Sequence, residues 1–214
     1  MPHLQPIKLL PARERIASIL RKAILSKEIE KSSVIKLEEI SSQLGVSLTP
    51  VREAFQILAR DGLIKLTPNK GAEVLAITPK FIQDHYETRR ILECAAITSV
   101  CLNRADTAEI ENAHKQSREA LEVQDFSDYT NFNQAFHMAI WAAADNLKIQ
   151  TLLSELWNGL SMGKNTTEKE YAQISIKEHA QILEAILLHD AGLAQQRMSN
   201  HITRSMQNML TRFD

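Results

Sequence analysis

Three histidines and one asparagine in the second half of the chain have the spacing of metal ligands. Asn133 and His137 stand four residues apart, so in a helix they share one face. His179 and His201 are equidistant from Asp190, where a turn between two helices is expected. In an antiparallel helix pair, two such residues lie at the same height and face each other. Three imidazoles and one amide oxygen, with open positions left over, suit Zn²⁺, Ni²⁺ or a similar divalent ion.

These side chains can meet only if the segments around them are packed helices. After Pro79 the sequence contains no further proline, and it predicts only helices separated by short turn segments. Six antiparallel helices of this length predict a bundle. The expected helices span residues 79–103, 106–123, 127–145, 147–162, 168–189 and 192–212.

A helical-bundle metalloenzyme is an alternative use of such a site. A di-metal carboxylate bundle needs two Glu-x-x-His motifs, and the sequence offers Glu111-Asn112-Ala113-His114 without a partner motif. A hydrolytic zinc site needs a carboxylate base near the metal. Glu178 adjoins His179, but it is expected to point about 100° away around the helix. The pattern therefore favours binding over catalysis, and no enzyme activity is predicted.

Length and composition limit the class of protein. The chain has 214 residues, of which 44% are hydrophobic and 24% charged, enough for one large or two small folded domains. No apolar run approaches the roughly 18 residues of a membrane-spanning helix, and the N-terminus lacks the layout of a signal peptide. Cys94 and Cys101 lie about 10 Å apart along one expected helix, too far for a disulfide. A reducing, cytoplasmic compartment is therefore expected.

The charge is divided unevenly along the chain. The net charge is −1, but residues 1–78 have a balance of +4 and residues 79–214 a balance of −5. All six prolines also lie at or before Pro79. We therefore expect a small basic domain over 1–78 and a larger acidic domain over 79–214. Such asymmetry is typical of a nucleic-acid-binding module joined to a second function.

The basic domain has the element order of a winged helix-turn-helix. Gly45 ends a short helix, Ser47 or Thr49 caps the next one, and Pro50 falls in its first turn. In this fold the third helix enters the major groove of DNA and the wing contacts the backbone or minor groove. The expected elements are helices over 11–27, 37–44 and about 47–60, followed by a hairpin of strands 63–66 and 72–75.

Polar residues occur where such a domain needs them. They cluster at the start of the third helix and on the hairpin, where a glycine in the turn would allow close approach to a phosphate. The predicted DNA-binding residues are Ser47, Thr49, Arg52, Lys65, Lys70 and Gly71. The opposite face of the third helix is apolar and is expected to face the core. For Arg52, a solvated helix charge paired with Glu53 or Gln56 is the alternative, and both lysines can also be ordinary surface charges.

The segments 44–55, 61–64 and 68–74 resemble the GntR family of bacterial transcription regulators. The resemblance continues in register from the helix-turn-helix into the wing. Two departures stand out. Leu48 occupies a position where the family usually has an arginine that contacts DNA, and leucine offers only an apolar contact, for instance to a thymine methyl group. The usual Gly-x-x-x-Pro-Gly turn before the second helix is also absent.

Residues 79–214 resemble the FCD ligand-binding domain of the FadR-type branch of this family, and six helices point to its shorter, VanR-like subgroup. The resemblance rests on segments 86–93, 133–137 with Asn146, 179–186 and 198–202. The resemblance implies that Asn133, His137, His179 and His201 bind a metal beside a small carboxylate effector. The family more often has Asp at the position of Asn133. Arg89 matches an arginine that lines the effector cavity, and the alternative for it is an ion pair with Glu93 on its own helix.

The sequence therefore predicts a homodimeric, cytoplasmic regulator that binds a double-stranded DNA operator and responds to a small effector through a Zn or Ni site. A DNA-binding dimer whose C-terminal domain only dimerises, with a degraded metal site, is the second hypothesis. A metalloenzyme is the third.

Overall fold

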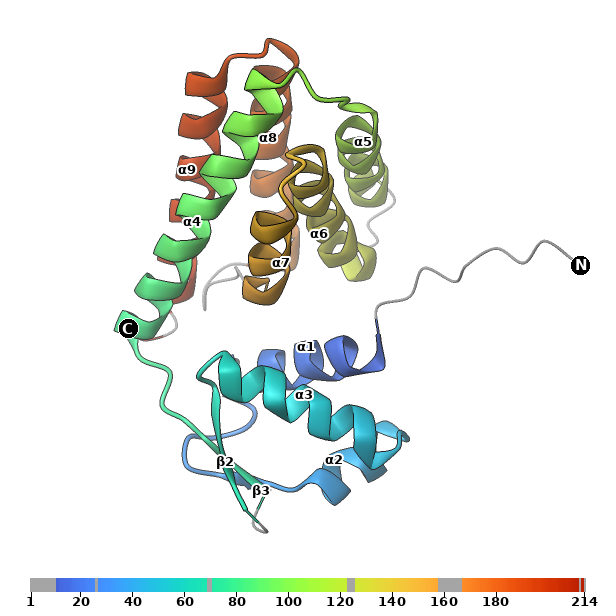
Figure 1. Ribbon diagram of the computed structural model, residues 1–214, viewed down its shortest axis with the longest axis vertical. Helices are drawn as coiled ribbons and strands as arrows, with labels where there is room; N and C mark the ends of the chain where they lie inside the picture. The colour runs from blue at the N-terminus through green and yellow to red at the C-terminus, as the bar shows by residue number, and fades with distance from the viewer. Residues whose placement is uncertain are drawn as a thin grey trace, which may run out of the picture. The chain divides into compact units, whose positions relative to one another are not determined.

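The structure is a computed structural model, and it describes residues 11–25, 27–68, 71–122, 126–157, 167–211 and 213, with side chains left out at 126–132 and 168. The chain is mainly helical, as predicted, with a small sheet near its N-terminus (Figure 1). It divides into two compact units, Met1–Ile77 and Thr78–Asp214, which are described separately below.

The N-terminal unit is a winged helix-turn-helix. Helix α3 buries Val51, Ala54, Phe55 and Leu58, which is the apolar face expected from the sequence. Gly45 ends α2 in the left-handed conformation that glycine adopts without a Cβ penalty. The elements are α1 (Ala12–Leu25), β1 (Val34–Ile35), α2 (Leu37–Leu44), α3 (Leu48–Arg60), β2 (Ile64–Thr67) and β3 (Gly71–Val74).

The wing has one more strand than the sequence indicated. Strands β2 and β3 form the expected antiparallel hairpin, and β1 pairs antiparallel with the other edge of β3, giving the order β1-β3-β2. A strand of two residues is too short for an alternating hydrophobic pattern. Its pairing ties the segment before α2 to the wing.

A buried ion pair fixes α1 against the end of α3. The Nη2 atom of Arg21 donates to Oδ2 of Asp61 at 2.6 Å, and only 8% and 17% of the two side chains are exposed. Asp61 follows the last residue of α3. The pair therefore sets the end of α3 relative to α1, a role that the sequence analysis did not assign to either residue.

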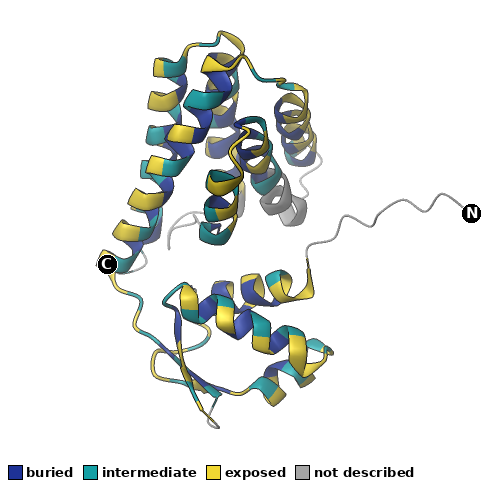
Figure 2. Ribbon diagram, in the orientation of Figure 1, coloured by how far each residue is buried: buried dark blue, intermediate teal, exposed yellow. Residues whose placement is uncertain are grey.

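The C-terminal unit is a helical bundle in which α4 and α9 pack along each other and α5 packs on α6 (Figure 1). Each helix buries one face and exposes the other (Figure 2). None of the helices in the described part of the chain is long and apolar enough to cross a membrane. The helices are α4 (Pro79–Leu102), α5 (Ala108–Glu122), α6 (Phe126–Ala143), α7 (Leu147–Leu156), α8 (Glu168–Leu187) and α9 (Ala191–Leu210).

Side-chain caps explain where four of these helices begin. The oxygens of Thr78, Asn146 and Asp190 accept from backbone N–H groups three residues later, and Thr167 forms a capping box with Glu170. Helix α7 is shorter than the expected span 147–162, because Trp157 already has an extended backbone. The residues that follow, 158–166, lie outside the described part. Cys94 and Cys101 are buried free thiols.

Candidate metal centre and DNA-binding surface

Three histidines from three helices meet inside the C-terminal bundle. His137 of α6, His179 of α8 and His201 of α9 are buried, with 0–2% of each residue exposed. One ring nitrogen from each lies within 4.8 Å of the others. The Nε2 atoms of His137 and His201 are 3.3 Å apart. Among the described residues, these are the ones that form a histidine, cysteine or carboxylate cluster able to hold a metal ion.

Carboxylates adjoin two of these histidines. Oε2 of Glu178 accepts a hydrogen bond from Nδ1 of His201 at 2.6 Å. Oε1 of Glu93 lies 3.0 Å from Nδ1 of His137, but the approach is too oblique for a hydrogen bond. An ionised carboxylate only accepts hydrogen bonds, so Nδ1 of His201 carries the hydrogen and the lone pair of the neutral ring lies on Nε2. This lone pair faces the centre of the cluster, as in carboxylate–histidine–metal arrangements.

His179 completes the cluster with two nitrogens that have no hydrogen-bond partner among the described residues. Neither Nδ1 nor Nε2 forms a hydrogen bond with any described residue, although both are buried. The ring stacks on Phe136, with 4.2 Å between the centroids and 16° between the planes. A buried polar group without a partner is costly. A metal ion that accepts one of these lone pairs would remove that cost.

Burial keeps the three rings neutral. It lowers the pKa of His137 and His179 below the usual 6.5, and it lowers the pKa of His201 to about 4 despite the hydrogen bond to Glu178. For His179 the neighbouring groups, namely the other two histidines, His114 and Arg204, lower the pKa further. Neutral imidazole is the form that binds a metal.

The distance between two of the three nitrogens fits a single ion. Two nitrogens bound tetrahedrally at about 2.0–2.1 Å from one Zn²⁺ would lie about 3.3 Å apart, and the two Nε2 atoms are 3.3 Å apart. Asn133 is buried on α6, one helical turn before His137. The three imidazoles therefore suit a divalent ion, with Asn133 on the adjoining turn of the same helix.

Glu93 links this cluster to Arg89 on the same helix. Its Oε1 accepts from Nε and Nη2 of Arg89 at 3.1 and 3.0 Å, and its Oε2 accepts from Nε1 of Trp141 at 2.7 Å. Burial alone would raise the pKa of Glu93, but His137, Arg89 and Trp141 together hold it at about 2. Arg89 also lies over the ring of Trp157, 4.4 Å from its centroid. The alternative considered for Arg89, an ion pair with Glu93, is therefore present.

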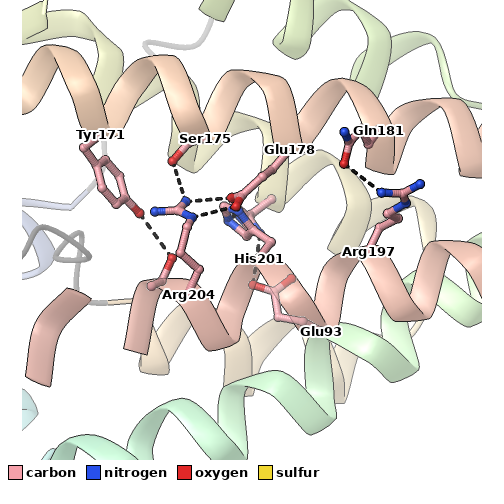
Figure 3. A network of polar contacts seen from close by, with 10 residues as sticks. Glu93, Tyr171, Ser175, Glu178, Gln181, Arg197, His201 and Arg204 are labelled. Carbon is pink, nitrogen blue, oxygen red and sulfur yellow. Dashed lines mark hydrogen bonds and ion pairs between the residues drawn. The ribbon is translucent and has the colours of Figure 1, made fainter. Parts of the chain in front are cut away.

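A second ion pair, between Arg204 and Glu178, lies beside His201 (Figure 3). Nε and Nη2 of Arg204 donate to the two oxygens of Glu178 at 2.6 and 2.7 Å, and Nη2 also donates to Ser175 at 2.9 Å. Glu178 thus reaches His201 and Arg204 across the α8–α9 pair. Glu178 was expected to point away from His179. It nevertheless belongs to the site, because it contacts His201 on the neighbouring helix.

Four of the six residues predicted to bind DNA are exposed in the N-terminal unit. Ser47, Thr49 and Arg52 are exposed at the start of α3, and Lys65 is exposed on β2. Ser47 is the N-cap residue, but its side chain makes no capping hydrogen bond. Glu53, considered as a partner for Arg52, instead lies 3.8 Å from Arg13. Lys70 lies outside the described residues.

Gly71 has an internal reason to be glycine. Its φ is +94°, and a Cβ atom there would lie 2.3 Å from the carbonyl oxygen of Ile35 in β1. The strand pairing therefore already requires glycine at this position. Its predicted close approach to a phosphate stays a prediction.

A winged helix joined to a helical bundle is an architecture of DNA-binding transcription regulators. The family model "Bacterial regulatory proteins, gntR family" matches residues 12–74, and the FCD domain model matches residues 84–204. The chain belongs to the GntR family and has the FCD architecture typical of its FadR-type branch. The matching families consist of transcription regulators rather than enzymes.

Individual relatives agree with this assignment. The HTH-type transcriptional repressor RspR of Escherichia coli is 25% identical over 203 residues, which cover 90% of this chain and 86% of that protein. The structure of E. coli McbR/YncC superposes with a TM-score of 0.74 at 17% identity, covering 96% of this chain and all of that one. The metal-free FCD domain of TM0439 gives a TM-score of 0.55 at 17% identity over 64% of this chain and 97% of that one. At these identities the two structures support the fold alone.

The sequence analysis missed the polar residues that support the histidines. Glu93 was considered only as a partner of Arg89, and Glu178 only as a catalytic base. Trp141 and Arg204 were not considered. A signal for Trp141 exists in hindsight, because it follows His137 by four residues and so shares its helix face.

Proposed function

We propose that this regulator changes its operator affinity when a small effector, of the carboxylate class, binds beside a divalent metal in the C-terminal domain. The observation that carries the proposal is the meeting of three buried histidine rings, with one nitrogen of each within 4.8 Å of the others. Two Nε2 atoms face each other 3.3 Å apart, and His179 presents two buried nitrogens without a partner among the described residues. Zn²⁺ and Ni²⁺ are the ions that such a ligand set suits best.

The proposal assigns roles to named residues. Residues 1–78 form the DNA-binding domain and residues 79–214 the effector-binding and dimerisation domain of a homodimer that works in the cytoplasm. The metal ligands are His137, His179 and His201, with Asn133 as an additional oxygen ligand. The DNA-contacting residues are Ser47, Thr49, Arg52, Lys65, Lys70 and Gly71.

Arg89 is proposed to recognise the carboxylate of the effector. Its guanidinium is buried between Glu93 and the ring of Trp157, which holds the fork of donors in a defined orientation. A guanidinium that already binds one carboxylate can bind a second carboxylate by donating its remaining N–H groups. The effector would then adjoin both Arg89 and the metal.

A second candidate function is a DNA-binding dimer whose C-terminal domain no longer binds a metal. It is favoured by one observation, the neutral amide of Asn133 where a carboxylate ligand is usual in the family. Under this alternative the histidine cluster would be a relic, and His179 would be buried with its nitrogens unsatisfied.

Elemental analysis of the purified, tag-free protein separates the two candidates. The proposal predicts near-stoichiometric Zn or Ni in the wild-type protein and its loss in the His179→Ala variant. Absence of metal in both proteins, even after incubation with Zn²⁺ or Ni²⁺, would leave the dimerisation domain as the better account.

A further inference from the structure

Helix α3 carries three exposed side chains of different chemistry on successive turns. Leu48, Arg52 and Gln56 are four residues apart, so they follow one another along one side of the helix. All three are exposed, and 38% of Leu48 is accessible. The core-facing side of α3 already consists of four buried apolar residues. Packing of the core therefore does not explain the types of residue at these three positions.

The polar groups on this side of α3 are not used within the N-terminal unit. The side chains of Arg52 and Gln56 form no hydrogen bond or ion pair with another described residue. The single carboxylate of α3, Glu53, lies 3.8 Å from Arg13, which offsets its repulsion of DNA phosphates. The first turn of the helix contains no acidic residue. Leu48, Arg52 and Gln56 can therefore all meet an outside partner that carries negative charge.

Each of these three side chains suits a different base in the major groove of DNA. Leucine contacts the C5-methyl group of thymine, arginine donates to O6 and N7 of guanine, and glutamine pairs with N6 and N7 of adenine. The third helix of a helix-turn-helix domain enters this groove. Four residues of helix rise about 6 Å, and one base pair rises about 3.4 Å. Neighbouring side chains of the three would therefore reach bases at most about two base pairs apart.

We propose that Leu48 and Gln56 read DNA on either side of Arg52, so that each operator half-site contains thymine, guanine and adenine in this order, on either strand. Neighbouring bases of the three are at most about two base pairs apart. This inference rests on the proposed insertion of α3 into the major groove and specifies which bases it selects. It adds Leu48 and Gln56 to the residues that contact DNA, and neither the metal nor the effector enters it.

The test removes single chemical groups from the bases of a bound duplex. The full-length wild type first selects a tightly bound fragment from random DNA. Deoxyuridine then replaces each thymine in turn, which removes the methyl group, and 7-deazaadenine replaces each adenine, which removes the N7 acceptor. We expect one thymine in each half-site to lower the affinity about fourfold when its methyl is removed. We expect one adenine, on the other side of a guanine, to lower the affinity about fivefold when its N7 is removed.

Matched variants assign each effect to one side chain. In Leu48→Ala the affinity should no longer depend on the thymine methyl, while the effect of 7-deazaadenine remains. In Gln56→Ala the two results should be reversed. Leu66→Ala is the control, because Leu66 is a leucine of the wing on β2 and is 45% exposed. The thymine methyl lies in the major groove, so both effects should persist in this variant.

The outcomes separate this inference from the proposed function. Absence of either effect in the wild type would overturn the inference, as would sensitive bases in another order. The same sensitivity in Leu48→Ala and in the wild type would also overturn it, and so would a failure to select any fragment. The comparison of bases in the wild type decides the question even if a variant does not fold. A selected fragment whose affinity does not respond to Zn²⁺ and acetate would instead contradict the proposed function and leave this inference standing.

Discussion

Glu93 is a buried carboxylate that contacts three polar groups of the C-terminal unit. It is fully buried and contacts Arg89, Trp141 and His137. We predict that Glu93→Gln lowers the free energy of unfolding by about 3–5 kcal/mol, because it leaves the guanidinium of Arg89 buried without a counter-charge. Urea denaturation of the metal-free protein measures this change.

An exposed ion pair in the same unit provides the control. Glu119 lies 3.8 Å from Lys115 on α5, and both side chains are more than half exposed. Glu119→Gln is expected to change the free energy of unfolding by less than about 1 kcal/mol. Similar losses in the two variants would show that the buried position of Glu93 has no special importance.

The buried histidines make stability depend on pH. The pKa of His201 is about 4 in the folded protein, because burial disfavours the charged ring, and 6.5 is its usual value. Between these values the unfolded chain binds more protons, so the free energy of unfolding falls as the pH is lowered. His201 alone accounts for a loss of about 2 kcal/mol between about pH 7.5 and pH 5.

Denaturation of the protein in the presence of a chelator measures this loss, and His137 and His179 should add to it because their pKa values are also lowered. Glu93 titrates at about 2, below this range. A free energy of unfolding that does not change between these two pH values would contradict neutral, buried rings.

At the level of residues, the sequence predicted the histidines better than their partners. His179 and His201 could be placed opposite each other because helical rise fixes height on both sides of a turn. The contact of Glu178 with His201 follows from the same helix pair, but it depends on how far each helix is rotated about its axis. The contact of Glu93 with Trp141 depends on the packing of α4 against α6, which no local pattern specifies.

At the level of elements, the wing depends on one glycine. Gly71 and Gly45 both have a positive φ. A Cβ atom at Gly71 would collide with the backbone of β1, whereas a Cβ atom at Gly45 would have no other atom within 4 Å. We predict that Gly71→Ala lowers the free energy of unfolding by about 3 kcal/mol, and that Gly45→Ala costs about 1–2 kcal/mol from the left-handed conformation alone. Urea denaturation of both variants makes the comparison. Equal costs would mean that β1 does not pair closely with β3.

The sequence predicted most elements because their boundaries carry local signals. Helix α2 has the expected range 37–44, since Gly45 is a strong helix terminator. The caps Asn146 and Asp190 likewise mark where α7 and α9 begin. Strand β1 could not be predicted, because two residues form a strand only through their pairing with β3.

At the level of the whole molecule, Leu48 should weaken the electrostatic part of DNA binding. It is the first residue of α3, is 38% exposed, and lies one turn before the exposed Arg52. We predict that Leu48→Arg tightens binding to non-specific duplex DNA and steepens the slope of log K against log salt concentration by roughly one unit, as expected for one more phosphate contact.

Leu102→Arg is the matched control for this change. Leu102 is an exposed leucine at the end of α4 in the other unit, 71% exposed. This variant adds the same charge to a unit that contains none of the proposed DNA-binding residues, so the salt slope is expected to stay as in the wild type. The same slope for both variants would mean that the start of α3 does not face DNA.

We propose that ligands in the C-terminal domain control operator binding. To test this, a tightly bound fragment is first selected from random DNA, and the affinity of the wild type and of His179→Ala for that fragment is then measured. The measurement is made once with Zn²⁺ and acetate and once with a chelator. We expect the ligands to change the affinity of the wild type about fivefold or more, in either direction, and to leave that of His179→Ala unchanged. Equal affinity of the wild type under both conditions would show that these ligands do not control operator binding.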